Sequence, residues 1–194
     1  MHKLTVEDLW SLEKYARERP AFRARVLAHK SRRRLPVGPN AVWLFEDRMT
    51  IQYQIQEMLR AERIFEPEGI LEELAAYNPL IPDGGNWKAT LLVEFPDQEE
   101  RRRQLAQLLG IERACWVQVA GFPRVHAIAD EDLQRENDVK TSAVHFLRFE
   151  LPAAAAAAFK AGAGLAAGID HDHYRHTVEA VPAQVRAALT ADLA

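Results

Sequence analysis

Residues 45–87 hold the densest local signals of the chain and read FEDRMTIQYQIQEMLRAERIFEPEGILEELAAYNPLIPDGGNW. Ile51, Ile55 and Leu59 recur at helical spacing, and glutamine and arginine side chains follow another face. This pattern predicts an amphipathic helix. A strand is the alternative for TIQYQIQ, where apolar residues alternate with glutamines, but the continuation EMLRAER consists of strong helix formers.

A second helix is expected directly after the first. Pro67 suits a first helical turn, because the N–H that proline lacks is unpaired there in any case. Glutamates in the first half of the segment lie near the positive end of the helix dipole, where negative charge is stabilising. Asn78-Pro79 ends the helix after Tyr77. We therefore expect strands on either side to be organised around a central pair of helices.

Extended segments flank this helix pair. Residues 34–37 and 41–45 are joined by Gly38-Pro39-Asn40, which predicts an antiparallel hairpin. Because Pro36 has no N–H to donate, the first of these strands is expected at the edge of the sheet. Further strands are expected at residues 87–95, 114–119, 124–129 and 141–151, the second and third of them as another hairpin.

Helices are expected at both ends of the chain and between the strands. An N-terminal pair is predicted from Thr5, as N-cap, to Arg19 and from Pro20 to about Lys30. Residues 168–181 form a polar stretch, and residues 129–140 an acidic loop or short helix. The remaining helices are expected at residues 97–109, 152–163 and 182–189.

Short turns join two of the strand pairs, so those pairs must be antiparallel. The sequence therefore predicts an α+β fold: a mostly antiparallel sheet of about five or six strands, helices packed on one face, and the N-terminal helix pair at one end. With 48% hydrophobic residues, 194 residues suffice for one sizeable core. We expect a single domain over residues 1–194, with an N-terminal helical segment (1–33), a central part of sheet and helices (34–151) and a C-terminal helical segment (152–194).

The composition narrows the functional classes. A net charge of -3 at pH 7 argues against a general nucleic-acid binder, which carries a basic excess. One cysteine, Cys115, excludes an intrachain disulfide, and the first ten residues contain no signal-peptide core. We expect a cytoplasmic protein with no membrane partner. Phosphate-binding loops, nucleophile elbows and CxxC pairs are missing from the sequence, which leaves open whether the protein is an enzyme.

Several longer motifs resemble one bacterial family. They are residues 44–90, ERRR at 100–103, WVQV at 116–119, IADEDLQREN at 128–137, KTSAVHFLRFEL at 140–151 and DHDHYRHT at 170–177. Together they cover nearly the whole chain and resemble the family named domain of unknown function 3501. Its members are often encoded beside rubrerythrin-like and iron–sulfur redox proteins, which implies a role in iron or peroxide handling. The resemblance brings no catalytic residues with it.

The run DHDHYRH, residues 170–176, places three of the seven histidines beside two carboxylates. His171 and His173 project to one side of an extended segment, whereas His173 and His176 are neighbours in a helix or turn. Either geometry offers two imidazoles to one ion, and imidazole with carboxylate suits iron, zinc, manganese or nickel. The alternative is a polar surface loop whose histidines bond to backbone or water.

Two more histidines, His126 and His145, lie on predicted strands and complete the candidate ligand set. His145 shares a strand face with Leu147 and Phe149, so a hydrogen-bonded core histidine is the competing interpretation. Cys115 alternates with apolar residues and is expected to be buried and inert.

Two further features suggest other partners. A polar row on the first central helix contains Gln52, Gln56, Glu57 and Arg60. It either lines a polar pocket or interface, or forms an exposed face strengthened by a Glu57–Arg60 pair. Eight Lys and Arg residues lie between Arg17 and Arg34 against one glutamate. That block either contacts an anionic partner or forms a solvated helix face.

The leading interpretation is a metal-binding or metalloprotein-associated accessory factor in redox or iron metabolism. Its expected cofactor is a transition metal, iron or zinc, held by His171, His173 and His176 with His126 or His145 as distant ligands. Its expected partner is a rubrerythrin-like or iron–sulfur redox protein, and a homo-oligomer is compatible with the sequence. The alternatives are a metal-free interaction module that uses the central helix pair and an anion or nucleic-acid binder that uses residues 17–34.

Overall fold

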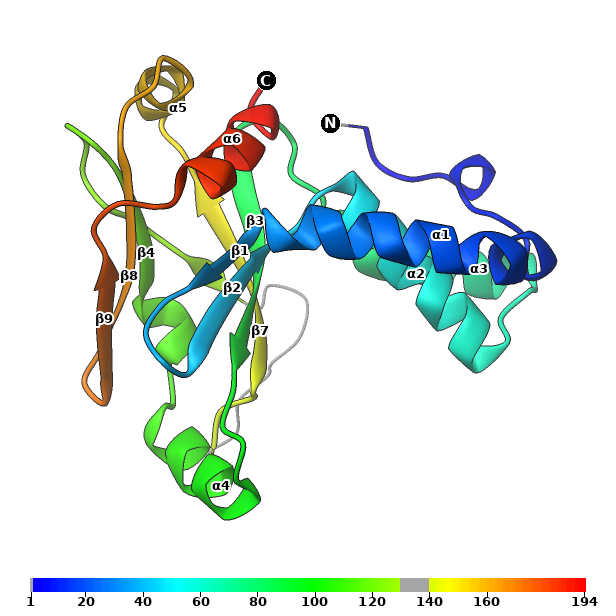
Figure 1. Ribbon diagram of the computed structural model, residues 1–194, viewed down its shortest axis with the longest axis horizontal. Coiled ribbons are helices and arrows are strands. Elements are labelled where there is room, and N and C mark those ends of the chain that lie inside the picture. The colour runs from blue at the N-terminus through cyan, green and yellow to red at the C-terminus, as the bar shows by residue number, and fades with distance from the viewer. Residues whose placement is uncertain (1, 130–139) are drawn as a thin grey trace.

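Two facing antiparallel sheets and a projecting layer of helices make up the computed structural model, which describes residues 2–129 and 140–194. Figure 1 shows the sheets side by side, with three helices extending from the outer side of one sheet. Two short helices lie at one end of the sheets and another at the opposite end. The fold is α+β with antiparallel strands, as the sequence predicts.

The first sheet has five strands in the order β1-β2-β3-β7-β6, and all neighbours pair antiparallel. The strands are β1 (Arg34–Pro36), β2 (Ala41–Phe45), β3 (Asn86–Val93), β6 (Ile128–Ala129) and β7 (Val144–Glu150). The β1-β2 hairpin confirms the predicted turn. Pro36 lies on the edge strand, where its missing N–H costs the sheet no ladder bond.

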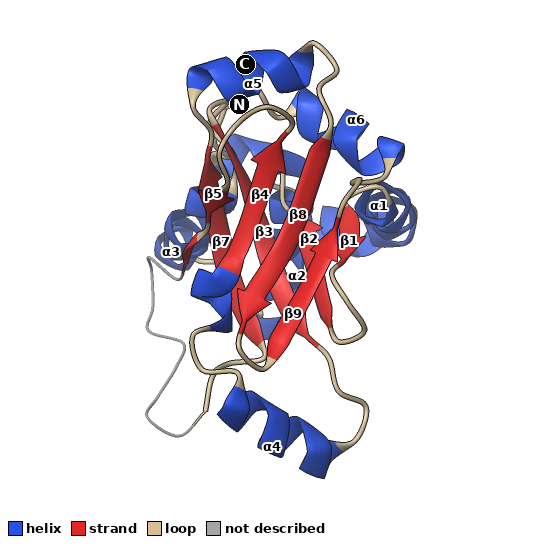
Figure 2. Ribbon diagram, turned by 90° about the vertical axis from the view of Figure 1, so that its left-hand side faces the viewer, coloured by secondary structure: helices blue, strands red, loops and turns tan. Residues whose placement is uncertain are grey.

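The second sheet, which faces the viewer in Figure 2, has four strands in the order β5-β4-β8-β9. They are β4 (Cys115–Val119), β5 (Val125–His126), β8 (Leu165–His171) and β9 (Tyr174–Val178). The predicted strand at 124–129 is divided between the sheets, because β5 pairs with β4 whereas β6 pairs with β7. The chain thus crosses from one sheet to the other at Ala127.

The β8-β9 hairpin occupies most of the polar stretch at 168–181, which is not among the strands predicted for the sheet and for which the sequence leaves open both an extended segment and a helix or turn. Leu165, Ala167 and Ile169 alternate inward on β8, but the small residues between them give a weak strand signal. On β9, polar side chains occupy most positions and hide the alternation. The described residues therefore form nine strands in two sheets, rather than one sheet of five or six.

The main core lies between the two sheets. Side chains that point inward from both sheets form it, among them Trp43, Leu91, Val117, Phe149 and Ile169. These residues alternate with outward ones along each strand, so one face of each sheet is removed from water. Cys115 belongs to this core, and burial raises the pKa of its thiol, as expected for an inert cysteine.

Short helices cover the ends of this core. The predicted C-terminal helices are α5 (Ala153–Lys160) and α6 (Ala183–Ala191), and α4 (Gln98–Gln107) lies at the opposite end. Trp87 anchors α6, because its indole N–H donates to the carbonyl of Leu189 at 3.0 Å. The same indole packs edge-on against the ring of Phe159 on α5.

The projecting layer consists of α1 (Leu12–Ser31), α2 (Arg48–Glu62) and α3 (Pro67–Tyr77). Ile51, Ile55 and Leu59 are buried on α2, which confirms the predicted helix over the strand alternative. Asp47 caps α2, since its carboxylate accepts the backbone N–H of Thr50 at 2.9 Å. The layer has a small hydrophobic core of its own beside the sheets.

The predicted N-terminal helix pair is one helix in the structure, α1, which passes through Pro20. A single 3-10 turn, η1 (Val6–Asp8), precedes it. Proline inside a helix costs about 3 kcal/mol. Tyr15, Phe22 and Val26 nevertheless form one continuous buried stripe on both sides of Pro20, and burial of that stripe offsets the cost.

Helices α1 and α2 are joined by a charged contact. The carboxylate of Glu57 accepts hydrogen bonds from the guanidinium of Arg19 at 2.7 and 2.8 Å and from the hydroxyl of Tyr15 at 2.6 Å. Gln56 is fully buried and bonds the backbone of Trp10. Gln52, Gln56 and Glu57 of the polar row therefore form an interface within the chain. Arg60 is exposed and lies 3.7 Å from Glu57, which is the pair that the alternative expects.

The two sheets are tied along one edge by the hydroxyl of Tyr174 on β9. It donates to the carbonyl of Val37 at 2.8 Å and accepts the backbone N–H groups of Asn40 and Ala41 at 2.9 and 3.0 Å. Gly38 permits this approach, because a Cβ there would lie 2.6 Å from the tyrosine hydroxyl and its φ is +78°. The turn between β1 and β2 is thereby held against β9.

Among the described helices, none is both long enough and apolar enough to cross a membrane. The acidic segment predicted at 129–140 falls, except for its two end residues, outside the described part of the chain. The structure therefore bears on neither its helical nor its loop interpretation.

Replacement of Tyr174 with Phe is expected to lower the free energy of unfolding by about 1–3 kcal/mol, since the buried N–H of Ala41 and the partly buried N–H of Asn40 lose their acceptor. Urea denaturation of both proteins measures this loss. Tyr77→Phe is the matched control, because the Tyr77 hydroxyl has no hydrogen-bond partner among the described residues. Equal stability of the two variants would contradict the role given to Tyr174.

The Glu57 contact predicts a dependence of stability on acid. The hydrogen bond from Arg19 lowers the pKa of Glu57 from 4.5 to about 2, so the folded state binds fewer protons than the unfolded state in that range. Its stabilisation is complete above pH 4.5 and lost as the pH falls through about 2. The difference in unfolding free energy between wild type and Glu57→Gln should therefore shrink over this range.

Urea unfolding at a series of pH values measures that difference. Glu179→Gln, at an exposed position, is the control and should keep the wild-type dependence on pH. A difference between wild type and Glu57→Gln that stays constant from pH 4.5 to 2 would rule out this linkage.

Candidate functional site

The candidate site is a groove on the outer face of the five-stranded sheet, where the helical layer meets the sheet. Three adjoining cavities of about 60, 290 and 520 Å³ form it. The first two share Leu80 and Phe146 in their linings, and the last two share Leu92 and Val144. A continuous depression therefore follows β3 and β7 past α2 and η2 (Asn78–Leu80).

Strand alternation supplies the floor of this groove. Leu91 on β3 and the residue opposite it on β7 point into the core, so their neighbours point outward. Thr90 lies opposite Phe146, and Leu92 lies opposite Val144. These four side chains are the floor on which a ligand can rest.

The central cavity, of about 290 Å³, has the most mixed lining. Its apolar members are Leu44, Ile51, Leu80, Leu92, Val144 and Phe146. Its polar members are Lys30, Glu46, Gln54, Tyr77 and Thr90. A largely apolar cavity with a few convergent polar groups is the usual form of a small-ligand site.

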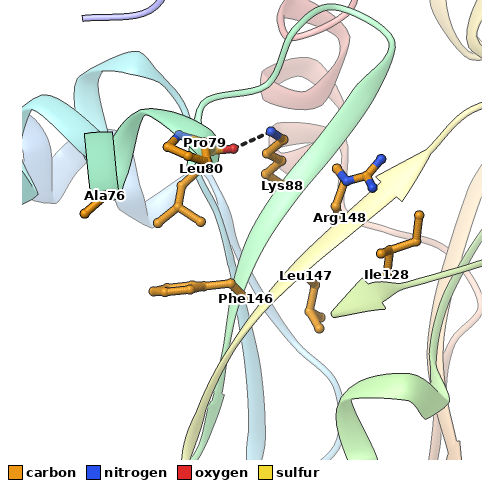
Figure 3. Close-up of a pocket in the computed structure, with 8 residues that line it drawn as sticks. All are labelled: Ala76, Pro79, Leu80, Lys88, Ile128, Phe146, Leu147 and Arg148. Atoms are coloured by element: carbon orange, nitrogen blue, oxygen red, sulfur yellow. Dashed lines mark hydrogen bonds between the residues drawn. The ribbon is translucent and has the colours of Figure 1, made fainter. Parts of the chain in front are cut away.

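Figure 3 shows the smallest cavity, at one end of the groove. Phe146 and Leu80 point toward each other, and the ammonium of Lys88 donates to the carbonyl of Pro79. Arg148 lies opposite Lys88 in the β3-β7 register and pairs with Glu150 two positions along its own strand. This end of the groove therefore carries two cations.

Glu46 is the most unusual residue of the central cavity. It follows β2 directly, and its side chain is only 7% exposed. Its carboxylate accepts hydrogen bonds from the hydroxyls of Thr50 at 2.5 Å and Thr90 at 2.6 Å. Among the described residues, no Lys, Arg or His nitrogen lies within ion-pair distance of it. A buried carboxylate of this kind is costly unless something positive reaches it.

Lys30, near the end of α1, also lines the central cavity. Its ammonium lies 5.8 Å from the centroid of the Tyr53 ring, which it approaches as a cation–π partner. It is half-buried. Lys30 therefore places a second charge at the rim, opposite in sign to Glu46.

Directly behind Glu46 lies a compact cluster of paired charges. Arg33 is 3% exposed and binds Asp192 with two hydrogen bonds of 2.7 and 2.9 Å, while its Nε lies 3.0 Å from Asp47. His29 also contacts Asp47, at 2.5 Å. Burial raises the pKa of Asp192, and the Arg33 guanidinium opposes that shift. Asp47 thus forms ion-pair contacts with its neighbours. Glu46 forms none, although its charge acts on Arg33 over a longer distance.

The predicted histidine cluster lies on the β8-β9 hairpin. The rings of His171 and His173 are brought within 5.9 Å of each other, between centroids. His171 Nε2 lies 2.9 Å from the carbonyl of Leu109, and its Nδ1 accepts the backbone N–H of His173. Both ring nitrogens of His171 are therefore engaged by the backbone, as the surface-loop alternative expects.

The remaining predicted ligands do not join this pair. The His176 ring lies on that of Tyr174, 4.6 Å between centroids, and His126 is exposed on β5. His145 is fully buried on β7, with Nε2 2.9 Å from the hydroxyl of Thr141, which fits the core-histidine interpretation. In the part of the chain that the structure describes, no three His, Cys, Asp or Glu side chains are arranged to hold a metal. Metal binding by these histidines stays a prediction.

The basic block from Arg17 to Arg34 lies on α1 and the start of β1. Two of its arginines form ion pairs within the chain: Arg19 pairs with Glu57, and Arg33 pairs with Asp192. Most of the others are exposed. Binding of an anion or nucleic acid by this block stays a prediction.

The sequence patterns do not indicate the groove. Thr90 is expected only as part of the strand at residues 87–95. A usable signal was present, because Glu46 and Asp47 follow an apolar strand and precede a capped helix, where carboxylates are often buried. The pairing of Glu46 with Thr90, 44 positions away, needs the β2-β3 register and is invisible in the sequence.

Comparisons with known proteins give the chain a family. A family model described as Protein of unknown function (DUF3501) matches residues 3–193. The chain is also similar to a novel protein of unknown function from Burkholderia pseudomallei K96243, known from a crystal structure, with 49% sequence identity over 100% of both chains and a TM-score of 0.94. No curated protein matches it. The chain therefore belongs to the DUF3501 family, as its sequence motifs indicate.

Proposed function

We propose that the protein binds a small, largely apolar compound that carries a positively charged nitrogen, in the central cavity of the groove. The observation that carries the proposal is the buried carboxylate of Glu46, which lines this cavity without an ion-pair partner among the described residues. The charged nitrogen would sit on Glu46, and the apolar body would lie on the floor of the groove.

Two hydrogen bonds fix the position of the Glu46 carboxylate. Thr50 and Thr90 each donate one hydroxyl proton to it, which orients the carboxylate and partly offsets its burial. Two neutral donors do not replace a counter-charge. A protonated amine supplies both the charge and further donors, so it fits this site better than a neutral or anionic group.

The apolar lining supports the second part of the ligand. Leu92, Val144 and Phe146 expose side chains on the floor that the chain itself leaves partly uncovered. Removal of such apolar surface from water by a ligand contributes about 25 cal/mol per Å² to the free energy of binding. A ligand with an apolar body thus gains affinity from the floor while Glu46 fixes its orientation.

Lys30 provides a way to choose between two classes of ligand. If the ligand is a simple cation, the ammonium of Lys30 at the rim repels it. If the ligand also carries an anionic group, Lys30 attracts that group. Removal of the Lys30 charge therefore strengthens binding of a simple amine and weakens binding of a zwitterion.

Phenethylamine and 3-phenylpropionate form a matched pair of probes, since they share an apolar body and differ in the sign of the charge. Titration by ligand-observed NMR is expected to show binding of the amine and weaker or no binding of the acid. Glu46→Gln keeps the size of the side chain and should weaken amine binding about 10-fold or more, as expected for a charge-assisted hydrogen bond. Lys30→Met should strengthen it.

Gln54→Glu is the positive control, because it adds a carboxylate to the same lining and should also strengthen amine binding. Three results would refute the proposal: no binding of the amine, equal binding by wild type and Glu46→Gln, or tighter binding of the acid. Circular dichroism of each variant checks that the fold is intact.

A metal-associated role is a second proposal, favoured by one observation. The β8-β9 hairpin brings the ring centroids of His171 and His173 within 5.9 Å of each other, and an ion bound there would replace one of the two backbone hydrogen bonds of His171. Iron or zinc is the proposed metal, and a rubrerythrin-like or iron–sulfur redox protein is the proposed partner. These two assignments rest on the histidine pattern and on the neighbours with which the family is encoded.

Elemental analysis of untagged protein, purified without chelator, tests this second proposal. Near-stoichiometric iron or zinc is expected in the wild type, and simultaneous replacement of His171, His173 and His176 with alanine is expected to remove it. His126→Ala tests whether His126, on β5, is a distant ligand, because loss of the metal in this variant would include it in the site. Metal content unchanged in the triple variant would exclude the hairpin as the site.

A further inference from the structure

A second surface lies at the end of the helical layer farthest from the sheets, where α1 begins, α2 ends and α3 begins (Figure 1). Phe65, in the connection from α2 to α3, is 68% exposed, and Leu71 on α3 is 55% exposed. They are the two most exposed large apolar side chains of the described residues. Phe65 and Leu71 are six positions apart in the chain, and exposed apolar side chains of this kind are typical of a protein-binding surface.

Beside Phe65 lies a cavity of about 310 Å³, which we call the tip cavity. Its lining residues are Trp10, Ser11, Leu12, Glu13, Leu59, Ile64, Phe65 and Ile70. Most of these side chains are apolar and come from three separate segments of the chain. A cavity of this kind can receive an apolar side chain of a partner, as the central pockets of protein interfaces do.

The charges around the tip cavity are mostly negative. From Glu62 to Tyr77 the sequence contains five glutamates and one arginine. On α3, Glu68 and Glu72 are exposed one turn apart, and Leu71 lies next to them. Glu13, at the start of α1, is also part of the cavity lining.

The chain compensates this negative charge only in part: Arg63 lies among the glutamates, and the ammonium of Lys14 lies 5.4 Å from the centroid of the Trp10 ring, which lines the tip cavity. Burial raises the pKa of Glu73, and the nearby carboxylates of Glu62 and Glu72 raise it further. One carboxylate oxygen of Glu73 is buried and has no hydrogen-bond partner among the described residues. Positive charge from outside the chain would therefore be favourable at this surface.

We propose that the end of the helical layer docks a basic amphipathic helix of a partner protein. An apolar side chain of that helix fills the tip cavity, and its lysine or arginine side chains face Glu66, Glu68 and Glu72. The exposed ring of Phe65 and the exposed side chain of Leu71 cover the apolar face of the bound helix. This surface is separate from the groove, so the two proposals stand or fall independently.

A labelled synthetic helix of leucine and lysine in an amphipathic pattern is the probe, and fluorescence anisotropy measures its binding to the full chain. A leucine and glutamate peptide of the same pattern is the charge control. The Phe65→Ala, Leu71→Ala double variant should weaken binding about 30-fold, as expected for loss of central apolar anchors. Glu66→Gln, Glu68→Gln and Glu72→Gln together should remove most of the dependence on salt.

Leu27→Ala is the matched control, because Leu27 is 50% exposed on α1 but does not line the tip cavity. It should bind the peptide as the wild type does. The proposal is overturned if the lysine peptide does not bind, if the glutamate peptide binds equally well, or if the double variant keeps wild-type affinity. Sedimentation velocity tests the competing occupant: self-association of the wild type that the double variant lacks would assign this surface to a second copy of the chain.

Discussion

The pairing of Arg33 with Asp192 and Asp47 is the constraint on which the arrangement of layers depends. Arg33 lies just before β1, Asp47 caps α2, and Asp192 follows α6, so one guanidinium joins the sheet, the helical layer and the C-terminal helix. Removal of one partner from such a buried group costs about 3–5 kcal/mol, because the other charge stays buried.

The position of Arg33 also explains why Asp47 forms ion pairs whereas the adjacent Glu46 does not. Asp47 faces Arg33 and His29 and is fully compensated. Glu46 points to the opposite side of the chain, since successive residues after a strand alternate in direction, and enters the groove. Thr50 bonds to both residues and holds the two carboxylates apart. Arg33 and His29 therefore pair with Asp47 where the layers meet, and the carboxylate of Glu46 lines the groove without an ion pair among the described residues.

Local patterns in the sequence were sufficient for most elements but not for their long-range partners. The α2 stripe, the β1-β2 hairpin and the alternation of β3 depend on neighbours a few residues apart, and each is confirmed. The continuous α1 and the β8-β9 hairpin were missed, because burial against distant elements outweighs a proline in one case and weak strand propensity in the other. The groove was missed for the same reason, since its lining comes from five separate segments.

The crossing of the chain at Ala127 and the contact made by Tyr174 have a joint consequence for the free edges of the sheets. Unpaired strand edges are templates for aggregation. Here β5 and β6 are two residues each, β1 is three residues long and contains Pro36, and the turn after β1 is held against β9. Three of the four edge strands are therefore short, and the turn after β1 contacts the fourth, β9, which disfavours edge-to-edge addition of a neighbouring molecule.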